Sequence, residues 1–222
     1  MLWRQRLPTK SVWVAVKPHF LGLFPKICDW HWEDRIGHVA HEWVVSSSVL
    51  SSPDYGGLTH DEARNATRKM NQDGRRHLIW FLGRIGKGNE DGWSKLVVPF
   101  VKNAWPRDAA LKTEASSSAW ISVLDDTGDA FPMMLQAVRE FLVPIRANHH
   151  WLFGLTRAVD NHTPSPVQFP KETLDLLTRI IPDDPLCAPY DLAQVLALIE
   201  EADPSLPTDQ RFRKLSGIAM GR

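Results

Sequence analysis

The chain contains 222 residues, of which 43% are hydrophobic and 23% charged, the composition of a folded globular protein rather than a disordered one. Its formal net charge of zero argues against the uniformly basic surface of a protein that coats nucleic acid. Two isolated cysteines exclude a cysteine-rich zinc site, and no apolar run reaches the ~18 residues that cross a bilayer, so we expect a cytoplasmic protein without membrane contact.

Residues 1–57 are expected to form a less regular N-terminal segment. The first 28 residues carry five Lys and Arg residues, no acid, and one short strand candidate at Ser11–Val16. An amphipathic helix is predicted at about 32–45, because apolar side chains recur there at helical spacing, namely Trp32, Ile36, Val39 and Trp43. The Ser-, Pro- and Gly-rich stretch 46–57 is typical of a domain boundary.

Residues 58–222 are predicted to form a helical-repeat domain. Thr59 and Glu62 have the spacing of a capping box, which predicts a helix from there to about residue 70. A second helix is expected at about 75–84, followed by a glycine-rich loop at 83–92. This loop superficially resembles a phosphate-binding loop, but it lacks the Ser or Thr and the preceding strand, so we interpret it as a connector.

A repeat of 38 residues organises the domain from about residue 93. An aromatic residue opens each unit and a proline closes its first helix; the openings are Trp93, Phe131 and Phe169, and the prolines are Pro106, Pro144 and Pro182. First helices are expected at about 94–105, 132–143 and 170–181. Second helices are expected at about 112–125, 146–160 and 189–202, with 206–222 as a terminal cap. Since one helical hairpin cannot bury its own apolar face, the period predicts an all-α fold of stacked αα-hairpins, a short HEAT/armadillo-like solenoid.

Two details of the repeat carry expectations of their own. Pro99 lies inside the first predicted helix of the first unit, so we expect a kink or a delayed start there. The aromatic residues of the repeat are expected in the core, namely Trp93, Trp120, Phe131 and Phe169.

The densest group of potential metal ligands lies on the predicted helix at 32–45. Asp34, His38 and His41 fall on one face, and three such side chains can hold a zinc ion that activates water. The pattern does not match the His-Glu-x-x-His motif, and polar residues opposite an apolar stripe are usually just solvated. We therefore predict no catalytic residue, metal or cofactor, and keep a metal-dependent hydrolase as the alternative.

Two charged groups are candidate interaction surfaces. Arg64 and Arg68, with Arg75 and Arg76 beyond them, form a basic patch that suits phosphate backbones, although interleaved acids favour a salt-bridged surface. Asp183 and Asp184 belong to an acidic cluster in the third repeat unit, set against the basic N-terminal end. Acidic clusters are usually only solvated, and the alternative is that this one contacts a protein partner or a second copy of the chain.

Several stretches resemble a known family. They are Trp93-Ser-Lys-Leu-Val-Val-Pro-Phe100, Trp105-Pro-Arg107, Phe131-Pro132 and Val143-Pro-Ile145. Residues 58–222 are similar to a helical C-terminal domain of unknown function in large sirtuin-like bacterial antiphage proteins. The nucleotide-consuming sirtuin domain has no counterpart here, so no catalytic residue is carried over.

The resemblance implies the sensing or scaffolding part of a defence system, as a subunit or a fragment of a larger protein. We accordingly expect a non-catalytic scaffold or protein-interaction and sensing module in bacterial antiviral defence. Its expected partners are other defence-system subunits or the same chain. A nucleic-acid-binding helical protein is a further alternative to the hydrolase.

Overall fold

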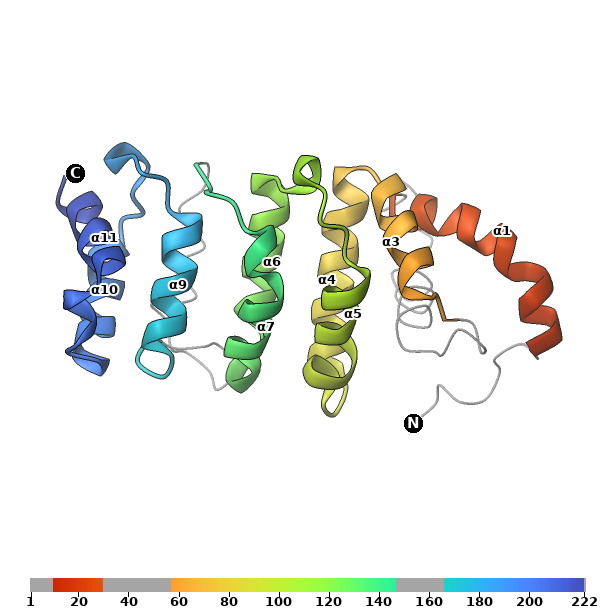
Figure 1. Cartoon of the computed structure of the whole chain (residues 1–222), viewed down its shortest axis with the longest axis horizontal. Helices are drawn as coiled ribbons and strands as arrows, with labels where there is room; N and C mark the ends of the chain where they lie inside the picture. The colour runs from red at the N-terminus through yellow and green to blue at the C-terminus, as the bar shows by residue number, and fades with distance from the viewer. Residues whose placement is uncertain (1–9, 30–56, 147–165, 222) are drawn as a thin grey trace. The chain divides into compact units, whose positions relative to one another are not determined.

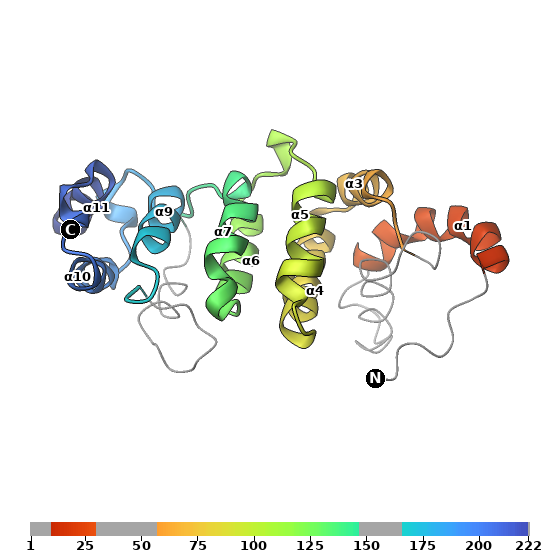
Figure 2. The same cartoon turned by 60° about the horizontal axis from the view of Figure 1, so that its bottom comes forward.

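The computed structural model describes residues 10–29, 57–146 and 166–221, and within these ranges it contains nine α-helices and no β-strand. The predicted all-α fold class is confirmed. The chain divides into two compact units, unit 1 (1–111) and unit 2 (112–222). Figures 1 and 2 show their helices from two directions.

Unit 1 consists of four α-helices and a short π-helix in its described residues. These are α1 (Lys10–Asp29), α3 (His60–Lys69), α4 (Gln72–Gly88), the π-helix η2 (Gly92–Val97) and α5 (Val98–Ala104). Helix α1 packs against α3 and α4, η2 packs against α4, and α5 packs against α3. Leu78, Leu82 and Val101 are fully buried at the centre of this packing.

Helix α1 corrects the expectation for the N-terminal segment. The strand candidate Ser11–Val16 is wrong, because these residues lie in a helix that continues through Pro18 and Pro25. A lone strand would leave its backbone groups without partners, whereas a helix bonds most of them internally. The helix also buries Phe24 and Cys28.

Two polar contacts join α1 to the helices that follow it. Lys17 forms an ion pair of 2.7 Å with Glu62 of α3, and Nδ1 of His77 in α4 lies 3.3 Å from the Cys28 carbonyl oxygen. Because α1 packs with α3 and α4, the boundary between the compact units follows Leu111, whereas the predicted domains met at 57/58. The predicted helix at about 32–45 lies outside the described residues.

Helices α3 and α4 occupy the predicted helical segments. The capping box is present: the Thr59 N–H donates to the Glu62 carboxylate at 2.8 Å, and the Glu62 N–H donates to the Thr59 hydroxyl at 3.2 Å. Helix α4 continues to Gly88, so the glycine-rich loop predicted at 83–92 is wrong over most of its length. Gly86 allows close packing here, since it is buried beneath the Trp93 ring.

The π-helix η2 occupies the start of the helix predicted at 94–105. Pro99 lies in the first turn of α5, where its missing N–H costs no helical hydrogen bond. The α-helix itself begins only at Val98, which confirms the expected delay.

Unit 2 contains five α-helices in its described residues. They are α6 (Glu114–Leu124), α7 (Phe131–Val138), α9 (Pro170–Ile180), α10 (Leu192–Ala202) and α11 (Gln210–Met220). Helix α6 packs on α7, α7 packs on α9, and α9, α10 and α11 pack on one another. Four predicted helices, at 112–125, 132–143, 170–181 and 189–202, are thus confirmed, while 146–160 lies outside the described residues.

The last helix, α11, is the expected terminal cap. Phe212, Leu215 and Ile218 are buried on the side that packs against α9 and α10. Short apolar helices need such cover because each one exposes an apolar stripe on its own.

The expectation for the aromatic residues is only partly met. Trp120 and Phe131 are fully buried, whereas Trp93 and Phe169 are half-buried. The Phe131 and Phe169 rings, one repeat apart, have centroids 5.8 Å from each other, so Phe169 covers Phe131 while part of its own ring stays exposed.

Polar contacts between residues about one repeat apart recur in both units. They are Arg64–Asn103, Arg68–Asp108, Gln168–Asp129 and Arg179–Arg139. Their separations of 39 or 40 residues are close to the 38-residue period. They are compatible with stacked hairpins, and the solenoid itself stays a prediction.

The contact between Gly86 and Trp93 generates a stability prediction. A Cβ atom at Gly86 would lie 2.5 Å from Cδ2 of Trp93, whereas one at Gly88 would meet nothing within 4 Å. We expect Gly86→Ala to lower the free energy of unfolding by about 1–3 kcal/mol, because the ring must shift. The matched control Gly88→Ala should stay within about 0.5 kcal/mol of the wild type. Urea unfolding measures both, and equal stabilities of the two variants would contradict the contact.

Asp125, at the C-terminal end of α6, is the other stability determinant with a testable signature. Burial raises the pKa of its carboxyl to about 7, and the neighbouring Asp126 charge adds to the shift. An unfolded Asp has a pKa of about 3.9. The folded state therefore prefers the protonated form, and this preference stabilises it fully below about pH 4.

We expect that stabilisation to be lost as pH rises from about 4 to about 7 and to change little above that. Asp125→Asn keeps the shape without the charge, so its free energy of unfolding should exceed that of the wild type by about 4 kcal/mol at pH 8 and match it at pH 4. Urea titrations at the two pH values test this. An Asn variant with the wild-type pH dependence would show that the carboxyl ionises freely in the folded protein.

Candidate functional site

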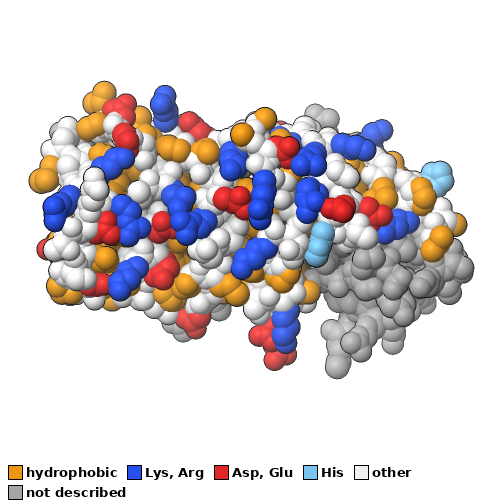
Figure 3. Space-filling model, viewed as in Figure 1, with side chains coloured by type: hydrophobic (Ala, Val, Ile, Leu, Met, Phe, Trp, Pro, Cys, Tyr) orange, Lys and Arg blue, Asp and Glu red, His pale blue; other side chains and the backbone are white. Residues whose placement is uncertain are grey.

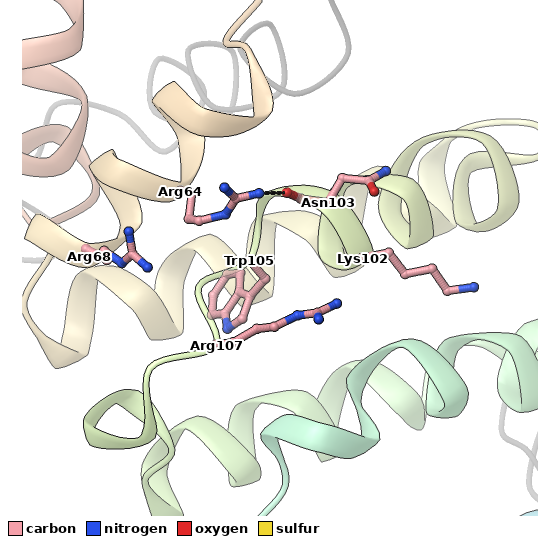
Figure 4. A pocket seen from close by; sticks show the side chains of 6 residues that line it. All are labelled: Arg64, Arg68, Lys102, Asn103, Trp105 and Arg107. Carbon is pink, nitrogen blue, oxygen red and sulfur yellow. Dashed lines mark hydrogen bonds between the residues drawn. The ribbon is translucent and has the colours of Figure 1, made fainter.

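A cationic hollow lies between α3 and the C-terminal end of α5 in unit 1. Arg64 and Arg68 are one helical turn apart on α3 and therefore share a face. Residues of α5 and of the chain after it supply the opposite side. The hollow has a volume of about 440 Å³ and is lined by Arg64, Arg68, Lys102, Asn103, Trp105 and Arg107. Figure 4 shows these side chains.

The end of α5 shapes the apolar part of the hollow. Trp105 leaves the helix with an extended backbone, and Pro106 follows it, so the helix stops there. Trp105 is only 5% exposed and Ala104 is fully buried. The indole is therefore fixed by packing, while Arg107, two residues further on, is exposed.

Two acids hold the arginines of α3 in place. Nη1 of Arg64 lies 2.6 Å from Asp61, and its Nη2 donates to the backbone carbonyl of Asn103 at the end of α5. Nε of Arg68 donates to Asp108 at 2.8 Å. The hydrogen bond from Arg68 is the main reason that the pKa of the Asp108 carboxyl lies below its ordinary value.

Three of the other lining side chains, those of Lys102, Asn103 and Arg107, are exposed hydrogen-bond donors. Lys102 has neither a hydrogen-bond nor an ion-pair partner within the described ranges, and the side chains of Asn103 and Arg107 are exposed. Figure 3 shows Lys and Arg side chains over α3 and α5, with acidic side chains beside them. The charged side chains that line the hollow are all cationic, so it suits an anion.

The structure brings together only part of the basic patch predicted from sequence. Arg64 and Arg68 both line the hollow. Arg75 is buried and donates to the Met70 carbonyl, and Arg76 forms an ion pair of 3.2 Å with Asp73. Neither lines the hollow.

Lys102 and Arg107 were missed by the sequence analysis. The repeat carried the signal that could have found them, since Lys102 stands 38 residues after Arg64 and Arg107 stands 39 after Arg68. The packing of α3 against α5 brings residues with this separation close together. A scan for like charges one period apart would have paired them.

The acidic residues Asp183 and Asp184 have roles within the chain. Asp183 forms an ion pair of 2.5 Å with Lys214 of α11, and Asp184 accepts a hydrogen bond from the Leu186 N–H at 3.0 Å. Both side chains remain exposed. Their role as an interaction surface stays a prediction.

The candidate metal ligands Asp34, His38 and His41 lie outside the described residues, so the hydrolase alternative also stays a prediction. Elsewhere, in the part of the chain that the structure describes, no three His, Cys, Asp or Glu side chains are grouped as metal ligands would be. Among the same residues no helix has both the length and the apolar character needed to span a membrane.

Comparisons with known proteins add one relative. No protein-family model and no solved structure matches the chain. The chain is 24% identical over 169 residues to the uncharacterized protein y4cA of Sinorhizobium fredii (strain NBRC 101917 / NGR234). The match covers 74% of this chain but 14% of the relative, so the chain corresponds to a small part of a much longer protein.

Proposed function

We propose that the chain is a non-catalytic helical interaction and sensing module in bacterial antiviral defence, and that the cationic hollow of unit 1 is its contact surface. One observation carries the proposal. Cationic side chains from α3, from α5 and from the chain just after α5 line one hollow, and one of these cations, Lys102, has no partner in the described part of the chain.

The repeat itself supports a functional origin for these charges. One repeat further on, Glu140 stands where Lys102 stands, and the buried Ile145 stands near the position of Arg107. Packing of equivalent helices therefore does not require cations at these places. Helical-repeat proteins commonly bind their partners along the extended surface that stacked repeats form.

The lining side chains favour binding over catalysis. Arg and Lys are protonated at neutral pH, Trp is a donor only, and an amide is neither a base nor a nucleophile there. General acid–base chemistry needs a group that titrates near the working pH. The hollow accordingly suits recognition of an anionic partner.

The defence assignment depends on the resemblance of residues 58–222 to the helical domain of sirtuin-like antiphage proteins. In that context a module without the nucleotide-consuming domain acts by contacting other components. The relative from Sinorhizobium fredii carries no printed activity and adds nothing on this point.

Phage challenge of the bacterium that carries the gene tests this proposal. We expect deletion of the gene to raise phage plating at least about tenfold, and reintroduction of the wild-type gene to reverse it. Arg64→Glu/Lys102→Glu should fail to restore protection, because the reversed charges repel an anion. Arg76→Glu is the matched control, since Arg76 is exposed and paired with an acid three residues before it, as Arg64 is.

Immunoblots must show equal amounts of each variant. Equal plating on the deletion and wild-type strains would refute the role in defence. Full protection by the Arg64→Glu/Lys102→Glu variant would refute the hollow as the contact surface.

A further inference from the structure

We propose that the cationic hollow binds a phosphate group, which is the feature by which the module recognises its ligand. The proposal rests on the function proposed above and names the chemistry of the contact. The ligand is a phosphate-bearing molecule, and the shared phosphate chemistry admits two sources, a free nucleotide and a nucleic-acid backbone.

An excess of donors is the first argument. Arg64 uses two N–H groups on Asp61 and the Asn103 carbonyl, and Arg68 uses one on Asp108. These bonds engage a minority of the donors of each guanidinium, and the Lys102 ammonium has no partner among the residues described. An occupant that satisfies such a surface must supply several acceptor oxygens and negative charge.

The arrangement of the donors is the second argument. Arg64 and Arg68 approach from α3, while Lys102 and Arg107 come from α5 and the chain just after it (Figure 4). A carboxylate is planar and presents two oxygens along one edge, which suits a single guanidinium fork. A tetrahedral phosphate presents oxygens in several directions, which suits donors that point in different directions.

The internal carboxylates support the same choice. Asp61 and Asp108 already bind the arginines in the way that a carboxylate ligand would, Asp61 on Arg64 and Asp108 on Arg68. The groups left over are the outer N–H groups of the arginines and the Lys102 point charge. Both arginine forks and lysine point charges bind phosphate in proteins.

Size and surrounding charge favour a compact ligand. A volume of about 440 Å³ lies within the range of small-molecule sites. Asp61 at the rim has a side chain 82% exposed, so a long polyanion that runs past the hollow meets a negative charge. The chain as a whole is neutral, which gives no general attraction for nucleic acid.

Calorimetric titration of the whole chain at low salt tests the proposal. The probes are adenosine 5′-monophosphate, single-stranded DNA of about 6 and about 20 nucleotides, and a hexaglutamate peptide. The variants are Lys102→Gln and Arg64→Gln, with Arg76→Gln as the control. Lys102→Gln is the most informative because it breaks no contact within the described structure.

We expect a phosphate probe to bind the wild type and each hollow variant to weaken that binding at least about fivefold. Arg76→Gln should change it less than about twofold. If adenosine 5′-monophosphate binds as tightly as the DNA, the ligand is a compact phosphate compound. If the affinity rises with DNA length, the ligand is a nucleic-acid backbone. Both results support a phosphate site.

Other results overturn it. Binding of the glutamate peptide without the phosphate probes would mean that the hollow receives an acidic protein segment. Absence of binding by every probe, or equal weakening by Arg76→Gln, would also refute the site. Loss of phage protection in the hollow variants without phosphate binding would refute this inference alone, whereas phosphate binding without any protection would refute only the defence role.

Discussion

The structure depends on one constraint: a short helix with an apolar stripe must have that stripe covered by another helix. The helices that carry the repeat are only a few turns long in both units. Local interactions alone therefore do not stabilise any of them. In each unit the cover comes from the next equivalent helix, as α5 covers α3 and α9 covers α7. The pair Phe131–Phe169 shows the constraint in its simplest form, one opening aromatic against the next.

The same constraint explains where the polar surface of unit 1 is hollow. When two helices pack along their apolar stripes, the polar side chains at the helix ends spread apart. At the end of α5 the chain must leave the helix because Pro106 follows Trp105. The departing chain carries Arg107 and Asp108 over to the Arg68 side, and the space between them becomes the hollow. Thus the proline that ends the helix also sets the position of a charged site.

Sequence reasoning found the fold because its signals are local and periodic. Prolines, opening aromatics and the Thr59–Glu62 capping box each mark a helix end by a steric or hydrogen-bonding rule that needs no tertiary information. The predictions were wrong where packing overrides local preference. Helix α1 continues through two prolines, and Gly86, which was predicted to lie in a loop, lies inside α4 against Trp93.

The site was half found for a related reason. Arg64 and Arg68 are one turn apart on a single helix, so their shared face follows from sequence. Arg75 and Arg76 are close to them in sequence, yet α4 buries one and pairs the other with Asp73. Lys102 and Arg107 are far away in sequence, and only contact between helices one repeat apart makes them neighbours.

Arg64 has two structural roles in unit 1. Its guanidinium donates to the carbonyl at the end of α5 and at the same time lines the hollow, so one group both fastens two neighbouring repeats and faces the occupant. Binding in the hollow and the contact between α3 and α5 are therefore linked thermodynamically. A ligand that takes the Arg64 guanidinium away from the Asn103 carbonyl weakens the contact between the two helices, and a change in that contact alters the affinity for the ligand. The hydrogen bond between Arg64 and the Asn103 carbonyl therefore joins the lining of the hollow to the packing of α3 on α5.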